Sequence, residues 1–374
     1  GVQTCALPIT LLQSTRRGFL RIGDLARSEL KLGGLRFNPE SRASVREKYL
    51  ERLALRPLVG GTAREVAGLP AEARMTEVQW SPDGKKIALV HVADSDSQLW
   101  IVDVATAQAR RVPAIRLNGT AGFEVHWMPD SLSLTVLAVP GQPGKAPQES
   151  LVPSGPSIQE HQGGKASART YQDLLKTPYD EDLLDYYLTS QVMWVKADGS
   201  LSKALTRPGI YVGASPSPDG KYFLVTSLHR PYSYSLPISS FPIKSEVLDL
   251  AGKSVRVIRD LPLEVNSPPD FDAVRPGPRS LEWRADAPAT LCWVETLDDG
   301  GSRKAVDFRE QLYLWSPGQA QPQAWLRLTQ RYRGVDWGER QNVLVHEGLW
   351  KTRKSKTLWV RPGEADRKST RLNS

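Results

Sequence analysis

The sequence is poor in the residue types that build redox and metal sites. Its 374 residues include two cysteines, three methionines and five histidines. The histidines are scattered without the paired spacing of a zinc site, so no metal ligands are predicted. Cys5 lies in a terminal segment that looks foreign, and Cys292 alone cannot form an internal disulfide. The sequence predicts neither a disulfide framework nor a bound metal or other cofactor.

Several signature motifs are also absent from the sequence. Neither Gly-x-Gly-x-x-Gly nor Gly-x-x-x-x-Gly-Lys-Ser/Thr occurs, which argues against nucleotide binding. The strained Gly-x-Ser-x-Gly turn of α/β-hydrolases is missing too, since the nearest match, at residues 213–217, lacks its second glycine. Apolar runs are only strand-sized, so no membrane-spanning helix is expected. No catalytic residue is predicted in this chain.

The net charge of +8 is modest for a chain of this length. Nucleic-acid binding normally needs lysines and arginines clustered on one face. The densest basic run, residues 351–356, lies between two apolar segments and is interpreted as a solvent-facing hairpin. Nucleic acid is therefore not an expected partner.

One turn motif recurs along the chain between apolar segments. Proline presets φ, aspartate can accept hydrogen bonds from its own backbone, and glycine accepts a positive φ, so Pro-Asp-Gly favours a tight turn between strands. Recurrence of one turn indicates a repeat architecture. The copies are Trp80-Ser81-Pro82-Asp83-Gly84, Trp127-Met128-Pro129-Asp130, Pro216-Ser217-Pro218-Asp219-Gly220-Lys221, Trp283-Arg284-Ala285-Asp286 and Trp337-Gly338-Glu339.

The segments around these turns predict an all-β fold of the β-propeller class. The run 87–92 after the first turn is apolar at successive positions, as a sheet sandwiched between two others requires. A following segment, 99–103, is interpreted as the outer strand. Five blades are recognisable, and an earlier one is expected around residues 35–66, so about six four-stranded blades of an incomplete propeller are predicted.

The predicted domain covers residues 10–362. Residues 1–9 and 368–374 look like translated sequencing-adapter scars and are excluded from the fold prediction. Residues 139–188 interrupt the repeat as one long insertion, rich at first in proline and glycine.

The last part of this insertion carries the start signals of a helix. Thr177 is a suitable N-cap and Pro178 suits the first helical position. Asp180 stands three residues after the cap, where an acidic side chain also suits the helix dipole. The sequence predicts a helix that begins at Pro178.

The segment His229–Tyr234 has the composition of a binding loop. It follows a predicted strand at 222–228, and it places Arg230 among aromatic residues. A guanidinium in such a setting suits recognition of a carboxylate. The alternative interpretation is a loop that packs its tyrosines and leaves Arg230 in water.

Longer motifs resemble the glutamyl endopeptidase branch of the prolyl oligopeptidase family. The resemblance spans about residues 20–362, and its most specific part lies in the insertion and just after it. The matching segments are residues 29–39, 168–176, 185–191, 217–222, 229–234, 271–280 and 350–353.

The resemblance implies a serine peptidase of two domains, in which an N-terminal propeller of seven or eight blades covers a C-terminal α/β-hydrolase domain. Such enzymes cleave peptide bonds after glutamate, and bacterial members are often periplasmic or secreted. We expect this chain to end before the hydrolase domain, which would be its missing partner, and to have no peptidase activity alone. Peptides are the expected substrates.

The resemblance also marks propeller residues that would bind the substrate carboxylate. Arg230, His229, Tyr232, Arg275 and Arg279 lie in family-like segments and are predicted to bind substrate. Two other readings stay open at this point. One is a freestanding propeller that binds proteins or peptides. The other is a propeller enzyme such as a glycosidase or lactonase, which would need acidic or metal-binding groups converging on the central channel.

Overall fold

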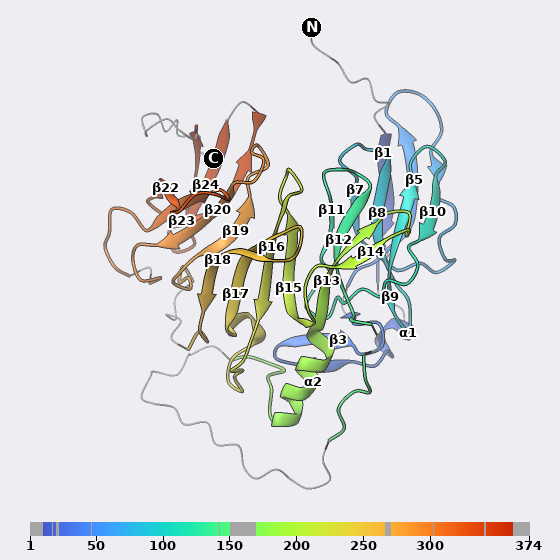
Figure 1. The fold of residues 1–374 in the computed structure, drawn as a ribbon, viewed down its shortest axis with the longest axis horizontal. Coiled ribbons are helices and arrows are strands. Elements are labelled where there is room, and N and C mark those ends of the chain that lie inside the picture. The colour runs from blue at the N-terminus through green and yellow to red at the C-terminus, as the bar shows by residue number, and fades with distance from the viewer. Residues whose placement is uncertain are drawn as a thin grey trace. The chain divides into compact units, whose positions relative to one another are not determined.

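The structure is a computed structural model of the 374-residue chain, and it consists almost entirely of antiparallel β-sheet (Figure 1). The described residues are 10–16, 18–19, 22–45, 47–141, 143–149, 170–265, 271–301, 303–339 and 342–361. Both predicted adapter segments, and residues 150–169 of the insertion, lie outside them. The chain divides into two compact units. Unit 1 comprises residues 1–153 and 173–215, and unit 2 comprises residues 154–172 and 216–374.

Unit 1 contains two blades, each built from four strands that follow one another in the chain. Strands β7 to β10 form the first blade and β11 to β14 the second, with every neighbouring pair antiparallel. Their bounds are β7 Met75–Trp80, β8 Lys86–Val92, β9 Ser97–Asp103, β10 Gln108–Arg111, β11 Val125–Trp127, β12 Ser133–Ala138, β13 Thr189–Lys196 and β14 Ser202–Ala204, and β13 also pairs with β15, Gly209–Pro216.

The segment expected to form an earlier blade folds differently. Strands β2, β3 and β4 make a small sheet of their own, whereas β5 pairs with β1 and β6 and reaches β7 through a single pair, Leu50 with Met75. Residues 35–66 are therefore divided between two sheets. The elements are β1 Thr10–Arg16, α1 Ile22–Leu25, β2 Leu30–Leu32, β3 Leu35–Asn38, β4 Ala43–Ser44, β5 Leu50–Pro57 and β6 Arg64–Glu65.

Unit 2 contains a four-stranded blade, β19 to β22, a three-stranded antiparallel sheet, β23–β25, and three consecutive antiparallel strands, β16 to β18, that belong to a larger sheet. Their bounds are β16 Tyr222–Leu228, β17 Ile243–Asp249, β18 Ser254–Leu261, β19 Arg279–Trp283, β20 Leu291–Thr296, β21 Glu310–Trp315, β22 Gln323–Leu328, β23 Arg331–Trp337, β24 Val343–Leu349 and β25 Lys354–Val360, with one 3₁₀ turn at Ile238–Ser240. Consecutive antiparallel meanders are the building blocks of a propeller, and the all-β, β-propeller class is confirmed.

The strand expected at the outer edge, residues 99–103, is not the last strand of its blade. It forms part of β9, which is third in order, and β10 lies outside it. Strand β10, Gln108-Ala109-Arg110-Arg111, is largely exposed and rich in polar residues. Its lack of an apolar run explains why hydrophobicity alone did not reveal it.

The predicted Pro-Asp-Gly turn is confirmed in atomic detail. Ser81 Oγ donates to the Asp83 carboxylate over 2.7 Å and accepts from the Lys86 amide over 2.9 Å, while Gly84 closes the turn at φ +69°. Ser217 bonds in the same way to Asp219 and to the next strand, and Gly220 adopts φ +70°. The same local chemistry therefore builds both turns.

Strand β8 is buried on both faces, as the sequence predicted. Ile87 and Leu89 pack toward β5 and β7, in a cluster with Leu53 and Met75. The alternate residues of β8, with Val90 among them, pack toward β11, β12 and β13. The central blade of unit 2 is enclosed in the same manner. Side chains of β20 and β21 pack toward β16 and β17 on one face and toward β24 on the other.

Helix α2, Pro178–Leu188, begins where the sequence predicted it (Figure 1). Thr177 Oγ1 accepts from the Asp180 amide and the Asp180 carboxylate accepts from the Thr177 amide, so both halves of a capping box are present. The helix packs on β3 through the rings of Phe37 and Tyr187, whose centroids are 5.3 Å apart. Among the described residues no helix has the length and apolarity needed to cross a bilayer.

We expect the stability of unit 1 to depend on pH through His91, on β8. It is 6% exposed, and burial lowers its pKa from 6.5 to about 4. The unfolded chain binds the proton more readily than the folded one. The free energy of unfolding should therefore have its full value above about pH 6.5 and fall by on the order of 3 kcal/mol as the pH drops to about 4. Urea unfolding across this range should show the slope, and His91→Leu should flatten it. A slope unchanged in His91→Leu would contradict the assignment.

Candidate functional site

The segment predicted to bind substrate lies at the end of β16 in unit 2. β16 ends at Leu228, so His229 and Arg230 follow the strand directly, as the sequence predicted. His229 Nε2 lies 3.1 Å from the Asp260 carboxylate on β18, and its Nδ1 lies 2.8 Å from the Arg230 carbonyl oxygen. Both side chains are exposed. The loop is thus tied to the neighbouring sheet but still presents its basic residues to solvent.

Aromatic stacking fixes the position of Arg230. Its guanidinium carbon lies 4.8 Å from the centre of the Tyr232 ring. Tyr232 is buried and stacks on Phe241, with centroids 5.1 Å apart and an angle of 18° between the rings. Loss of the Tyr232 ring would remove the surface on which the guanidinium rests.

Arg275 joins this cluster from a separate loop. Its guanidinium donates to the carbonyl oxygens of Phe241 and Pro262, and it lies 3.9 Å from the Glu264 carboxylate. Arg275 is therefore linked to Arg230 through the backbone of Phe241 and the Phe241–Tyr232 stack. We call Arg230, Tyr232, Phe241 and Arg275, with Arg259, the arginine cluster.

Arg259 is the member of this cluster that the sequence did not reveal. Its guanidinium donates to Ser245 Oγ over 2.9 Å and to the Pro278 carbonyl over 3.1 Å. Burial, and then the charge of Arg275, lower its pKa to about 10. Burial also lowers the pKa of Arg275, an effect that Glu264 opposes. Two partly buried cations close together favour the approach of an anion.

Arg279, the remaining predicted residue, has a different partner. It is an ion-pair partner of Glu310, a fully buried carboxylate that Arg331 also contacts. Burial lowers the pKa of Arg279 and the Glu310 charge opposes that shift. The structure therefore brings His229, Arg230, Tyr232 and Arg275 together and holds Arg279 in an internal ion pair.

One hydroxyl–imidazole–carboxylate relay occurs on the last sheet of unit 2. His346 lies 2.9 Å from both the Thr357 hydroxyl and the Asp336 carboxylate. These residues stand on adjacent strands, and His346 and Thr357 are direct cross-strand partners. The relay is a cross-strand polar contact.

Other groups capable of covalent or metal chemistry are not assembled in the described residues. No group of three or more potential metal ligands occurs there. Cys292 is buried on β20, and burial raises the pKa of its thiol, which disfavours the nucleophilic thiolate. What the arginine cluster offers chemically is positive charge and N–H donors.

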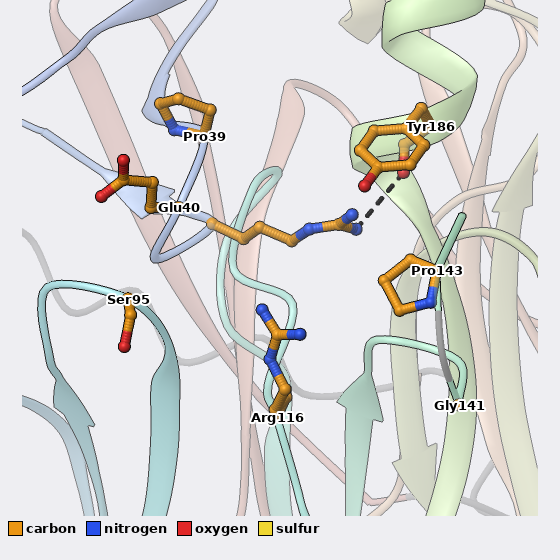
Figure 2. Close-up of a pocket in the computed structure, with 8 residues that line it drawn as sticks. Pro39, Glu40, Ser95, Arg116, Gly141, Pro143 and Tyr186 are labelled. Carbon is orange, nitrogen blue, oxygen red and sulfur yellow. Dashed lines mark hydrogen bonds between the residues drawn. The ribbon is translucent and has the colours of Figure 1, made fainter. Parts of the chain in front are cut away.

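Unit 1 contains a cavity of about 560 Å³ that the sequence did not reveal (Figure 2). Its walls come from five separate segments of the chain, one of them in α2. The lining residues are Pro39, Glu40, Arg42, Ser95, Arg116, Gly141, Pro143 and Tyr186. No sequence motif connects them. The only sequence hint was the departure of residues 139–188 from the repeat, which placed a non-repeating segment beside the blades.

Comparisons with known proteins identify close relatives by sequence. The chain is 38% identical, over 94% of its length, to a probable chloroplastic glutamyl endopeptidase of Oryza sativa subsp. japonica, and 37% identical to that of Arabidopsis thaliana. It spans about two fifths of the length of these relatives, 39% and 38% respectively. No protein-family model matches the chain.

Solved structures match the chain at low sequence identity. The tricorn protease is 12% identical, with a TM-score of 0.49 over 93% of this chain and 30% of that protein. An acylaminoacyl peptidase of Pyrococcus horikoshii is 11% identical, with a TM-score of 0.42 over 92% of this chain and 45% of the other.

Proposed function

Because the chain belongs to the glutamyl endopeptidase branch of the prolyl oligopeptidase family, we propose that it is the substrate-gating part of a serine endopeptidase that cleaves after glutamate. The observation that carries this proposal is the 38% identity extending over 94% of the chain. A catalytic α/β-hydrolase domain would be supplied by the rest of a longer protein. The chain itself would contribute no nucleophile.

The blades suit a role as a barrier. In two of them the central strands, β8 and β20, are enclosed on both faces by neighbouring sheets, so these blades form walls with loops at their ends. A wall of this kind over a nucleophile would exclude folded proteins and admit short or unfolded peptides. Exclusion of bulk water would also strengthen electrostatic recognition of the substrate.

The arginine cluster supplies a chemical basis for selecting glutamate. Arg230 is exposed and lies over the Tyr232 ring, and Arg259 and Arg275 are the two further cations of the cluster, the second of them beside Glu264. A glutamate carboxylate gains charge-assisted hydrogen bonds from a guanidinium that the neutral amide of glutamine cannot match. We propose that this cluster contributes to recognition of the substrate carboxylate.

The test of this function is an assay of the longer protein that contains this chain. Peptides identical except for Glu or Gln at one position would be compared, with and without a serine-directed covalent inhibitor. Inhibitor-sensitive cleavage after Glu, and little after Gln, is expected. Tight binding of the Glu peptide without any cleavage would instead support a freestanding peptide-binding propeller.

Arg230→Ala should reduce kcat/KM for cleavage after Glu by roughly tenfold or more, since a hydrogen bond to a charged group contributes about 1.5–3 kcal/mol. Cleavage after Gln should change little. Arg353→Ala is the matched control, because Arg353 also lies over an aromatic ring, that of Trp350, at 3.7 Å. Equal loss in both variants, or unchanged selectivity in Arg230→Ala, would remove Arg230 from the recognition site.

A further inference from the structure

Two guanidinium groups border the cavity of unit 1. Arg42 follows β3 in a left-handed conformation, with φ +51°, and is only 4% exposed. Arg116 comes from the connection between β10 and β11 and is exposed. In Figure 2 the Arg116 side chain points into the space between Glu40 and Ser95 on one side and Tyr186 and Pro143 on the other. The cavity thus has one buried and one accessible cation.

Helix α2 holds Arg42 in place. Its Nη1 donates to the carbonyl oxygens of Tyr186 and Tyr187, over 3.3 and 3.2 Å. Its guanidinium carbon lies 5.0 and 5.4 Å from the centres of the same two rings. These carbonyls belong to the last turn of α2, where the helix dipole is negative. The guanidinium is therefore preorganised before any ligand arrives.

Neither arginine has a carboxylate partner within the described chain. Glu40 lines the same cavity, but in Figure 2 its carboxylate points away from Arg116. Burial lowers the pKa of Arg42, and the charge of Arg116 acts in the same direction. Carbonyl oxygens and ring faces offset the cost of burying the charge only in part. An anion in the cavity would interact favourably with both guanidinium groups.

The shape of the cavity indicates which anion it can accept. About 560 Å³ lies within the range of pockets for small organic ligands, roughly 300–1,000 Å³. Its walls include the rings of Pro39, Pro143 and Tyr186, which can pack against the apolar part of a ligand. Guanidinium groups match the two oxygens of a carboxylate. The ligand should therefore combine a carboxylate with carbon-rich surface.

We propose that this cavity binds the carboxylate of an acidic peptide, as an anion site separate in sequence from the arginine cluster of unit 2. The choice of a peptide as ligand rests on the proposed function, whereas the preference for an anion rests on Arg42 and Arg116 alone. Inorganic phosphate offers similar charge without the carbon surface. It serves as the competing probe.

Isothermal titration calorimetry on the full 374-residue chain tests the proposal. The probes are an end-capped tetrapeptide containing Glu, the same peptide with Gln, and inorganic phosphate. Arg116→Ala should weaken binding of the Glu peptide by about tenfold or more, and the Gln peptide should bind weakly to every variant. Arg110→Ala, at an exposed arginine on β10 outside the cavity, is the matched control and should bind like the unaltered chain.

Because Arg116 is exposed, its truncation should leave the thermal unfolding temperature unchanged, which separates lost binding from lost folding. Equal affinities in Arg116→Ala and Arg110→Ala, or equal affinities for the Glu and Gln peptides, would overturn the proposal. So would phosphate binding that depends on Arg116 while the peptide does not bind. The titration needs no catalysis. If the longer protein does not cleave after Glu but Arg116-dependent binding is still observed, the proposed function is contradicted and the anion site is supported.

Discussion

Asp298→Asn should destabilise unit 2 by about 3–5 kcal/mol, because it removes one partner of a buried ion-pair network. Both oxygens of Asp298 accept from Arg331 over 2.8 Å, and one also accepts from Arg309 over 2.8 Å. Asp298 is 2% exposed and Arg331 is 1% exposed. With the carboxylate gone, Arg331 would keep Glu310 and a backbone carbonyl, and Arg309 would lose its ion pair.

The neighbouring residue provides the matched control for this substitution. Asp299 carries the same carboxylate, but its side chain is exposed and pairs with Lys304, over 3.1 Å. Asparagine tolerates the positive φ of this position, so Asp299→Asn should cost less than about 1 kcal/mol. Free energies of unfolding from urea denaturation would be compared for both variants. Similar losses would show that the network is not what stabilises this region.

Gly300→Ala should destabilise unit 2 by roughly 2–4 kcal/mol, through backbone strain combined with a steric clash. Gly300 adopts φ +81°, and a Cβ atom there would lie 2.1 Å from the Val274 carbonyl oxygen. The Gly300 carbonyl in turn accepts from the Val274 amide over 3.0 Å. Because Val274 precedes Arg275, the displaced loop should also shift a member of the arginine cluster.

Gly318→Ala separates the two contributions. Gly318 has φ +94°, yet a Cβ atom there would meet nothing within 4 Å. It should therefore show only the left-handed strain, about 1–2 kcal/mol. Thermal unfolding followed by circular dichroism measures both variants. If Gly300→Ala is no less stable than Gly318→Ala, the close approach of the two loops does not contribute to stability.

The sequence predicted the parts of the fold that depend on neighbouring residues. The turn at Ser81–Gly84 is closed by side-chain contacts within five residues, and the start of α2 by contacts between Thr177 and Asp180. The doubly apolar run of β8 indicated a strand enclosed by two sheets. The sequence could not show how residues 35–66 divide between two sheets. That division arises because β3 pairs with β2 while β5 pairs with β1.

The candidate site could be predicted only in part. The placement of His229 and Arg230 after β16 was visible in the sequence, since it depends on where one strand ends. Arg275 joins the same loop through its hydrogen bond to the Phe241 carbonyl. Arg279 instead pairs with Glu310, which lies on a different strand, β21. Neither relationship has a sequence signal. The substrate-binding role of these five residues stays a prediction.

The sequence alone determined the turn chemistry, the sandwiched strands, the capped helix and the family, because each depends on short contiguous segments. Only the tertiary structure decided which arginines meet. Arg42 and Arg116 meet at one cavity because Arg42 is bonded to the last turn of α2 and the connection that carries Arg116 borders the same space. Charged side chains far apart in the chain become neighbours through strand register and loop packing, and no local pattern records those distances.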